Sequence, residues 1–264
     1  MSSKEIKEKI RAKRGFISDM DGVIYHGNKL LPGVIEFVEW MKSENKPFLF
    51  LTNSSERTPR ELQEKMQRLG IELDESVFYT SALATASFLA SQKPRGTAFI
   101  IGEAGLISAM YDVGYTMNNV NPDYVIVGDT RSYSFDKIEQ AVNLVLRGAR
   151  LIGTNPDVTG PVEGGIIPAT KALMAPIELA TGKTAYYVGK PNPVMMRIAL
   201  KRLGCVREDT IIIGDRMDTD IIAGIESGID TCLVLTGIST RATVREFPYV
   251  PNFILDGVKD IIDI

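Results

Sequence analysis

Short runs of apolar, often β-branched residues alternate with amphipathic stretches along most of the chain. Residues 15–18 and 47–52 have the length and composition of buried strands, and so do residues 209–214 and 232–235. Such alternation is typical of βα units that surround a parallel sheet. The pattern therefore predicts an α/β fold with a Rossmann-like parallel sheet.

The segment after residues 47–52 carries clear signals for a helix. Thr58 can cap the helix, Pro59 occupies its first position, and Glu61 completes a capping box. Gly70 then ends it. Residues 1–14 mix Lys, Arg and Glu without an apolar stretch, so they predict a short solvated helix and argue against a signal peptide.

The middle of the chain repeats the same alternation on a smaller scale. We expect strands at 97–101, 124–127 and 151–153, and helices at 106–112, 135–147 and 173–180, the second capped by Ser134 and stopped by Gly148. This segment is long enough to form a small α/β domain. We predict that residues 94–186 form such an inserted domain, and that residues 1–93 and 187–264 form the larger one.

Composition and charge narrow the class of protein. The chain has 264 residues, of which 44% are hydrophobic and 24% charged, as in ordinary globular proteins. No apolar stretch is long enough to span a membrane, and the net charge of −3 argues against non-specific nucleic-acid binding. The two cysteines form no disulfide framework or metal motif, which fits a reducing, cytoplasmic location.

The chain contains a single histidine, His26. A zinc site built from several imidazoles is therefore excluded. A Ser-His-Asp triad could be built only with His26. If the protein is an enzyme, carboxylates, lysines and hydroxyls must perform its chemistry. A solvated position is the expectation for His26.

Two carboxylates follow the first predicted strand, in the motif Asp19-Met20-Asp21-Gly22. Ligands of parallel sheets bind beyond the carboxyl ends of the strands, so both side chains should project into a site. A carboxylate nucleophile can divide phosphate transfer into two easier displacements, while a second carboxylic acid protonates the leaving oxygen. A solvated turn at the strand end is the competing interpretation.

Three further segments carry polar residues at or beyond the ends of predicted strands. Thr52, Asn53 and Ser54 offer hydroxyls and backbone N–H groups for phosphoryl oxygens, and Lys190 in Gly-Lys-Pro could neutralise their charge. Asp215 at a strand tip could bind magnesium together with Asp19. Asp220 could orient the metal ligands without contacting the metal itself. Each segment alone also fits an ordinary loop, helix entry or surface lysine.

Taken in order, the four segments closely resemble the motifs of the haloacid dehalogenase superfamily of phosphohydrolases. The chain runs only 31 positions from Asp21 to Thr52 but 137 from Asn53 to Lys190, far more than an ordinary connection. The inserted domain thus lies between the second and third motifs. This arrangement is similar to the NagD-type or 4-nitrophenylphosphatase-like branch, which carries an α/β cap.

The resemblance implies a magnesium-dependent phosphatase that works through an aspartyl-phosphate. Asp19 would attack phosphorus, and Asp21 would protonate the leaving group and then activate water. Mg²⁺ would be held by the Asp19 carboxylate, the Asp21 main-chain carbonyl and Asp215, with support from Asp220. The phosphoryl oxygens would be bound by the remaining motif residues, Thr52, Asn53, Ser54 and Lys190.

The cap would determine which substrates the protein accepts. Asn155 and Asp157 are the candidate specificity residues there, although an ordinary Asn-Pro turn explains them equally well. Sugar phosphates, phosphoglycolate, nucleotides and aryl phosphates such as 4-nitrophenyl phosphate are all candidate substrates. A phosphotransferase or mutase, and a non-catalytic phosphometabolite-binding regulator, are the alternative functions. Capped members of this branch often pair through their caps, so a homodimer is also an expectation.

Overall fold

The computed structural model describes residues 2–162 and 164–262, which divide into two compact units. The first unit comprises residues 1–52, 63–79 and 195–264, and the second comprises 53–62 and 80–194. The second unit thus includes the segment 94–186 together with residues on each side of it. That 94–186 form a separate cap domain stays a prediction.

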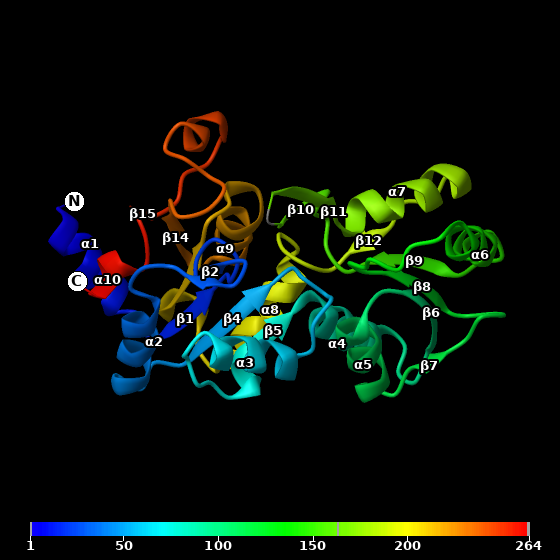
Figure 1. Cartoon of the computed structure of the whole chain (residues 1–264), viewed down its shortest axis with the longest axis horizontal. Coiled ribbons are helices and arrows are strands. Elements are labelled where there is room, and N and C mark those ends of the chain that lie inside the picture. The colour runs from blue at the N-terminus through cyan, green and yellow to red at the C-terminus, as the bar shows by residue number, and fades with distance from the viewer. Residues whose placement is uncertain (1, 163, 263–264) are drawn as a thin grey trace. The chain divides into compact units, whose positions relative to one another are not determined.

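The first unit contains a six-stranded sheet in the order β15-β14-β13-β1-β4-β5 (Figure 1). Its strands are β1 (Gly15–Ser18), β4 (Phe48–Thr52), β5 (Phe78–Thr80), β13 (Thr210–Gly214), β14 (Asp230–Val234) and β15 (Phe253–Leu255). β1 pairs with both β4 and β13 in parallel. Every residue of β1 and β13 is buried, so both faces of the sheet are covered.

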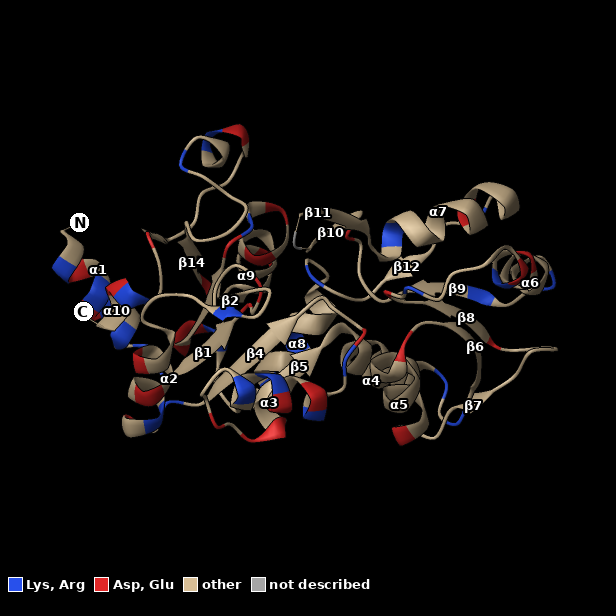
Figure 2. Cartoon of the chain, viewed as in Figure 1, with Lys and Arg blue, Asp and Glu red and all other residues tan. Residues whose placement is uncertain are grey.

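Helices and a short hairpin complete the first unit. The helices are α1 (Ser3–Arg11), α2 (Val34–Ser43), the C-terminal part of α3 (Pro59–Arg68), most of α8 (Pro193–Leu203), α9 (Ile222–Ser227) and α10 (Lys259–Ile262). β2 (Tyr25–His26) and β3 (Lys29–Leu30) form an antiparallel hairpin directly after the first motif. Figure 2 shows that β1 and β4 carry no charged residues, whereas α2 and α3 do.

The second unit is built around a five-stranded sheet in the order β12-β9-β8-β6-β7. The strands are β6 (Thr97–Ile101), β7 (Thr116–Met117), β8 (Tyr124–Val127), β9 (Arg150–Gly153) and β12 (Tyr186–Tyr187), with all neighbouring pairs parallel. Its helices are α4 (Ser81–Gln92), α5 (Ala104–Asp112), α6 (Phe135–Leu146) and α7 (Thr170–Thr181). A hydrophobic core forms where α6 and α7 pack on β6, β8 and β9.

The α/β fold and most of the predicted elements are confirmed. The capping box at α3 forms as expected, because the Thr58 N–H donates to the Glu61 carboxylate at 2.8 Å and the Glu61 N–H donates to the Thr58 hydroxyl at 3.2 Å. Ser134 likewise caps α6, and Gly148 follows that helix with a positive φ of 114°. α1 begins and ends within the predicted range of 1–14.

Three elements of the second unit do not follow from the sequence pattern. α4 is rich in Ala and Ser, so its faces differ little in polarity and give no helical period. The strands β10 (Thr159–Val162) and β11 (Gly165–Pro168) form an antiparallel hairpin from residues dominated by Gly and Pro, a composition typical of loops. Among the described residues no helix is both long and apolar enough to cross a bilayer.

Candidate active site

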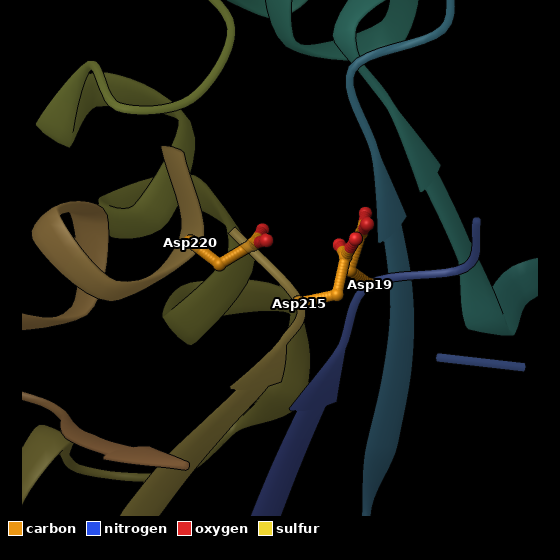
Figure 3. A group of neighbouring side chains, drawn as sticks. All are labelled: Asp19, Asp215 and Asp220. Atoms are coloured by element: carbon orange, nitrogen blue, oxygen red, sulfur yellow. The ribbon is translucent and has the colours of Figure 1, made fainter. Parts of the chain in front are cut away.

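Three buried carboxylates meet at the carboxyl ends of neighbouring strands in the first unit. Asp19 follows β1, Asp215 follows β13, and Asp220 lies in η3, the π-helical turn Met217–Ile221. One oxygen from each lies within 4.8 Å of the others, and the residues are 9%, 3% and 0% exposed. Figure 3 shows Asp19 and Asp215 projecting side by side from the two strand ends, with the Asp220 carboxylate turned toward them.

The sheet register explains why Asp19 and Asp215 come together. Ser18 lies opposite Ile213 in the β1–β13 ladder, and the Asp19 N–H donates to the Ile213 carbonyl at 2.8 Å. Both strands then end at the same edge of the sheet, where a parallel α/β protein binds its ligands. The two motifs therefore converge through strand pairing alone.

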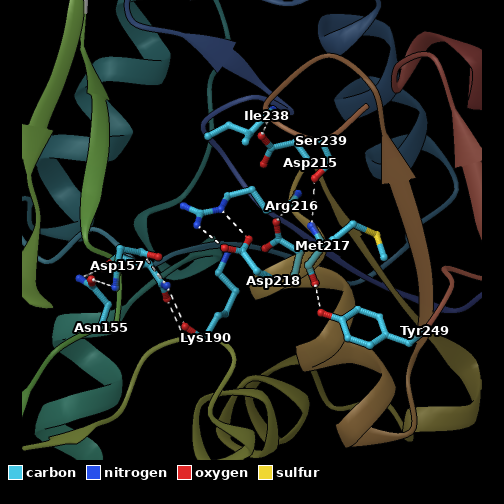
Figure 4. A network of polar contacts seen from close by, with 12 residues as sticks. Asn155, Asp157, Lys190, Asp215, Arg216, Met217, Asp218, Ile238, Ser239 and Tyr249 are labelled. Carbon is cyan, nitrogen blue, oxygen red and sulfur yellow. Dashed lines mark hydrogen bonds and ion pairs between the residues drawn. The ribbon is translucent and has the colours of Figure 1, made fainter. Parts of the chain in front are cut away.

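The Asp215 carboxylate is held by the loop that follows β14. The Ile238 N–H donates to Asp215 Oδ2 at 2.8 Å, and the Ser239 N–H donates to the Asp215 carbonyl at 3.0 Å (Figure 4). A Cβ at Gly237 would lie 1.9 Å from Oδ2, and one at Gly22, where φ is +82°, would lie 2.5 Å from it. Only glycine fits these two positions, so the backbone forms a tight cradle around the carboxylate.

Asp220 is the third member of the acidic group, and its role in supporting the metal site stays a prediction. Its Oδ2 accepts a hydrogen bond from the Arg216 N–H at 3.2 Å, which turns the chain back toward Asp215. η3 is held in place because the Ser239 hydroxyl accepts from the Met217 N–H and the Tyr249 hydroxyl donates to the Met217 carbonyl, both at 3.1 Å. This carboxylate can therefore contact a cation directly as well as orient other ligands.

Asp218 lies in the same turn but serves a different purpose. Its two oxygens accept hydrogen bonds from the Arg216 guanidinium at 3.0 and 2.8 Å, and 53% of its side chain is exposed. Partial burial alone would raise the pKa of the Asp218 carboxyl, but the bonds and charge of Arg216 outweigh it and hold that pKa below its usual value. Asp218 is thus a surface ion-pair partner that stands outside the acidic group.

The donor set of the acidic group fits magnesium. Three buried carboxylates supply only oxygen ligands, which a small hard divalent cation prefers, and they include no soft sulfur or imidazole donor. Asp21 is predicted to contribute its main-chain carbonyl to the metal site. The acidic group is defined by side-chain oxygens alone, so the role of the Asp21 carbonyl stays a prediction. The Asp21 side chain itself is exposed, at the start of the turn that leads into β2.

The predicted phosphate-binding residues lie at the end of β4, directly after it, or shortly before α8. Thr52 is the last residue of β4, is buried, and lies at the same sheet edge as Asp19 because Ser18 pairs with Phe50. Asn53, Ser54 and Lys190 belong to the second unit. The Ser54 hydroxyl accepts from the Glu56 N–H at 3.5 Å, a long hydrogen bond at a loop start.

In the second unit, Asn53 ties the predicted lysine and cap residues together. Its Nδ2 donates to the Lys190 carbonyl and to Asp157 Oδ2, each at 3.0 Å, and its Oδ1 accepts from the Lys190 N–H at 2.7 Å. Asn155 in turn donates to the Asn53 carbonyl at 2.8 Å and accepts from the Asp157 N–H at 3.1 Å. Figure 4 shows Asn155, Asp157 and Lys190 within this network. The structure therefore brings together four residues that come from three separate segments of the sequence.

Asp129 is the residue of this network that the sequence analysis missed. Oδ1 accepts from the N–H and hydroxyl of Thr170 at 3.0 and 2.8 Å, and Oδ2 accepts from Asn155 Nδ2 at 3.1 Å and from the N–H and hydroxyl of Ser55 at 3.2 and 3.3 Å. A signal for it exists, since Asp129 follows strand β8 by two positions just as Asn155 follows β9. Burial raises the pKa of the nearby Glu56 carboxyl, and the negative charge of Asp129 is the second cause of this increase.

Replacing Asp129 with Asn should destabilise the second unit. The substitution turns one acceptor oxygen into an NH₂ group that faces other donors, at an expected cost of about 1–3 kcal/mol. Thermal and denaturant unfolding measure this cost, with Asp112→Asn, an exposed change at the end of α5, as the matched control. Equal stability of the two variants would show that the five hydrogen bonds contribute little.

Comparisons with known proteins bear on both units. Residues 16–116 match the family model described as haloacid dehalogenase-like hydrolase, and residues 187–261 match the HAD-hydrolase-like model. The dihydroxyacetone phosphatase of Corynebacterium glutamicum is 46% identical over 94% of this chain and 90% of its own length. The ribonucleotide monophosphatase NagD of Escherichia coli K12 is 42% identical over 94% of this chain and 98% of its own.

Solved structures show the same similarity. NagD from Escherichia coli superposes with a TM-score of 0.89 at 41% identity, over 94% of this chain and 98% of that one. The 4-nitrophenylphosphatase of Thermotoga maritima superposes with a TM-score of 0.92 at 30% identity, over 97% of this chain and 98% of that one. The likeness thus extends over both units and through all four motifs.

Proposed function

Because this chain belongs to the haloacid dehalogenase-like hydrolase family and is a phosphoric monoester hydrolase, we propose that it cleaves small phosphomonoesters through an aspartyl-phosphate on Asp19. The observation that carries the proposal is the buried group of Asp19 and Asp215, which follow β1 and β13, and Asp220, which lies within η3. Such a group concentrates negative charge that a divalent cation would balance.

The first half of the reaction forms the covalent intermediate. A carboxylate oxygen of Asp19 attacks phosphorus in line with the ester oxygen, and the bond between phosphorus and that oxygen breaks. Asp21, in its protonated form, donates a proton to the departing oxygen, so the product leaves as an alcohol. Asp19 then carries the phosphoryl group as a mixed anhydride.

The second half returns Asp19 to its starting state. Asp21, now ionised, accepts a proton from a water molecule whose oxygen attacks phosphorus. The bond between phosphorus and the Asp19 oxygen breaks, and inorganic phosphate leaves. The two carboxylates therefore have distinct tasks, and neither can replace the other.

Asp19, Asp215 and the Asp21 main-chain carbonyl would hold Mg²⁺, with Asp220 close enough to contact it as well. When bound, the cation neutralises charge that develops on the phosphoryl oxygens. Thr52, Asn53, Ser54 and Lys190 are proposed, from the family motifs, to bind those oxygens. Asn155 and Asp157 are proposed to influence substrate choice, because both are hydrogen-bonded in the network around Asn53 and Lys190.

The substrate class is proposed from relatives of two kinds. One relative is named for a three-carbon keto-phosphate and another for ribonucleoside monophosphates, so the assay should contain both together with hexose phosphates and 4-nitrophenyl phosphate. We expect magnesium-dependent release of inorganic phosphate from at least one of them. Transfer of the phosphoryl group to an added alcohol with no phosphate release would indicate a phosphotransferase, and tight binding without turnover would contradict the proposal.

Two further predictions concern the whole molecule. We propose that two copies pair through residues 94–186 and that the protein acts in the cytoplasm. Light scattering on purified protein measures the mass in solution, and a mass of one chain at micromolar concentration would contradict pairing.

A further inference from the structure

The segment that carries Asp21 closes into a tight turn before the β2–β3 hairpin. The Met20 carbonyl accepts hydrogen bonds from the Ile24 and Tyr25 N–H groups at 2.8 and 3.2 Å, and the Gly22 N–H donates to the Tyr25 carbonyl at 2.9 Å. The Asp21 side chain is exposed on this turn. The position of the Asp21 backbone depends on the contacts that hold the turn and the hairpin.

Thr236, in the loop after β14, fastens this segment at two points. Its hydroxyl donates to the Gly22 carbonyl at 2.6 Å, and its own carbonyl lies 2.7 Å from His26 Nε2. A carbonyl oxygen only accepts, so His26 must carry a proton on Nε2 and donate it to this bond. One bond holds the residue next to Asp21, and the other holds the first strand of the hairpin.

The same loop also holds the metal-site carboxylate. Ile238, two residues after Thr236, donates its N–H to Asp215 Oδ2. Gly237 between them passes so close to Asp215 that no side chain fits. The loop 236–239 thus connects the backbone beside Asp21 with the Asp215 carboxylate through one short, rigid stretch.

A third contact holds Tyr25 in the hairpin. The Lys65 ammonium lies 3.3 Å from the centroid of the Tyr25 ring, and Lys65 is only 7% exposed. A partly desolvated cation over an aromatic ring is attracted by the negative face of the ring. The hairpin is therefore packed against α3 as well as tied to the loop after β14.

We propose that Thr236 and His26 are positioning residues for Asp21. By fixing the Gly22 carbonyl and the first hairpin strand, they hold the Asp21 carboxyl where it meets the leaving oxygen. The inference rests on the proposed phosphatase mechanism, in which Asp21 is the proton donor. It assigns a task to the single histidine of the chain, which is exposed as expected, and to a threonine that no motif includes.

The choice of leaving group separates positioning from a general structural effect. A 4-nitrophenolate leaves readily without a proton, whereas the alkoxide of an alkyl phosphate requires one. Misplacing the Asp21 carboxyl should therefore slow the cleavage of alkyl phosphates much more than that of 4-nitrophenyl phosphate. Loss of fold or of metal binding would reduce both rates equally.

The experiment compares two pairs of variants on both substrates. Thr236→Val removes the hydroxyl and Thr236→Ser keeps it; His26→Ala removes the donor and His26→Gln keeps one at a similar position. We measure kcat/KM with glycerol phosphate and with 4-nitrophenyl phosphate, because this quantity reports the step in which the leaving group departs. Asp21→Asn gives the profile expected when the donor is lost, and thermal unfolding checks the fold of each variant.

We expect Thr236→Val and His26→Ala to lose about tenfold or more in kcat/KM on the alkyl phosphate relative to the aryl phosphate. Thr236→Ser and His26→Gln should stay close to the unaltered protein. Equal losses on both substrates, or no loss on either, would overturn the inference. These outcomes leave the phosphatase proposal standing because they concern only the position of Asp21, whereas a failure of the unaltered protein to release phosphate would contradict that proposal itself. His26 is exposed, so His26→Ala keeps the test valid if Thr236→Val does not fold.

Discussion

Asp19→Asn protein should lose at least about 10³-fold in kcat on any phosphomonoester that the unaltered chain hydrolyses. An amide oxygen is a poor nucleophile, and its attack would not yield a stable acyl-phosphate. The neighbouring carboxylates cannot substitute for Asp19. Asp215 is held by the Ile238 N–H, and Asp220 by the Arg216 N–H.

Stability should change far less than activity in this variant. Asn has nearly the shape of Asp, and the Asp19 N–H keeps its bond to the Ile213 carbonyl. Removal of one charge from a group of three buried carboxylates also relieves repulsion between them. Steady-state kinetics and thermal unfolding measured together test this expectation. If the variant loses activity because it unfolds, the loss does not support Asp19 as the nucleophile.

Asp215→Asn protein should lose on the order of 10²-fold in kcat and require more Mg²⁺ to reach it. Asp215 lies at the strand tip beside Asp19, and its position is fixed by the cradle of Gly22 and Gly237. Loss of its charge weakens the hold on the cation that neutralises the phosphoryl oxygens. Titration of activity with Mg²⁺ after treatment with a chelator measures both effects.

Asp218→Asn is the matched control for this titration. Asp218 lies three positions along the chain and pairs with Arg216 at the surface, outside the acidic group. Its activity and Mg²⁺ dependence should stay within a few-fold of the unaltered protein. If the chelator leaves full activity, or if both variants respond alike, Asp215 is not a ligand for the activating cation.

Strand ends made the acidic group predictable. Asp19 and Asp215 each follow a short buried strand, and parallel pairing of those strands brings both residues to one edge of the sheet. The same rule, applied to the second unit, would have found Asp129 after β8. It was overlooked because Gly-Asp-Thr there resembles an ordinary turn and matches no phosphatase motif.

Contacts that depend on tertiary structure could not be predicted. Thr236 contacts Gly22 across more than 200 positions of the chain, and nothing in the local sequence marks it. The π-helical turn places the Asp220 carboxylate within the acidic group, which local sequence does not specify, and its predicted supporting role stays a prediction. A helix of small residues such as α4 has no polar face, so periodicity alone could not reveal it.

Identification of the phosphorylated residue tests the account most directly. The unaltered protein is mixed with substrate and Mg²⁺, quenched in acid during turnover, and digested, and the peptides are examined for a phosphoryl group by mass spectrometry. The account predicts an acid-stable, base-labile phosphoryl group on the peptide that contains Asp19, and none on Asp19→Asn protein. A phosphoryl group on any other residue, or full turnover by Asp19→Asn protein, would contradict it.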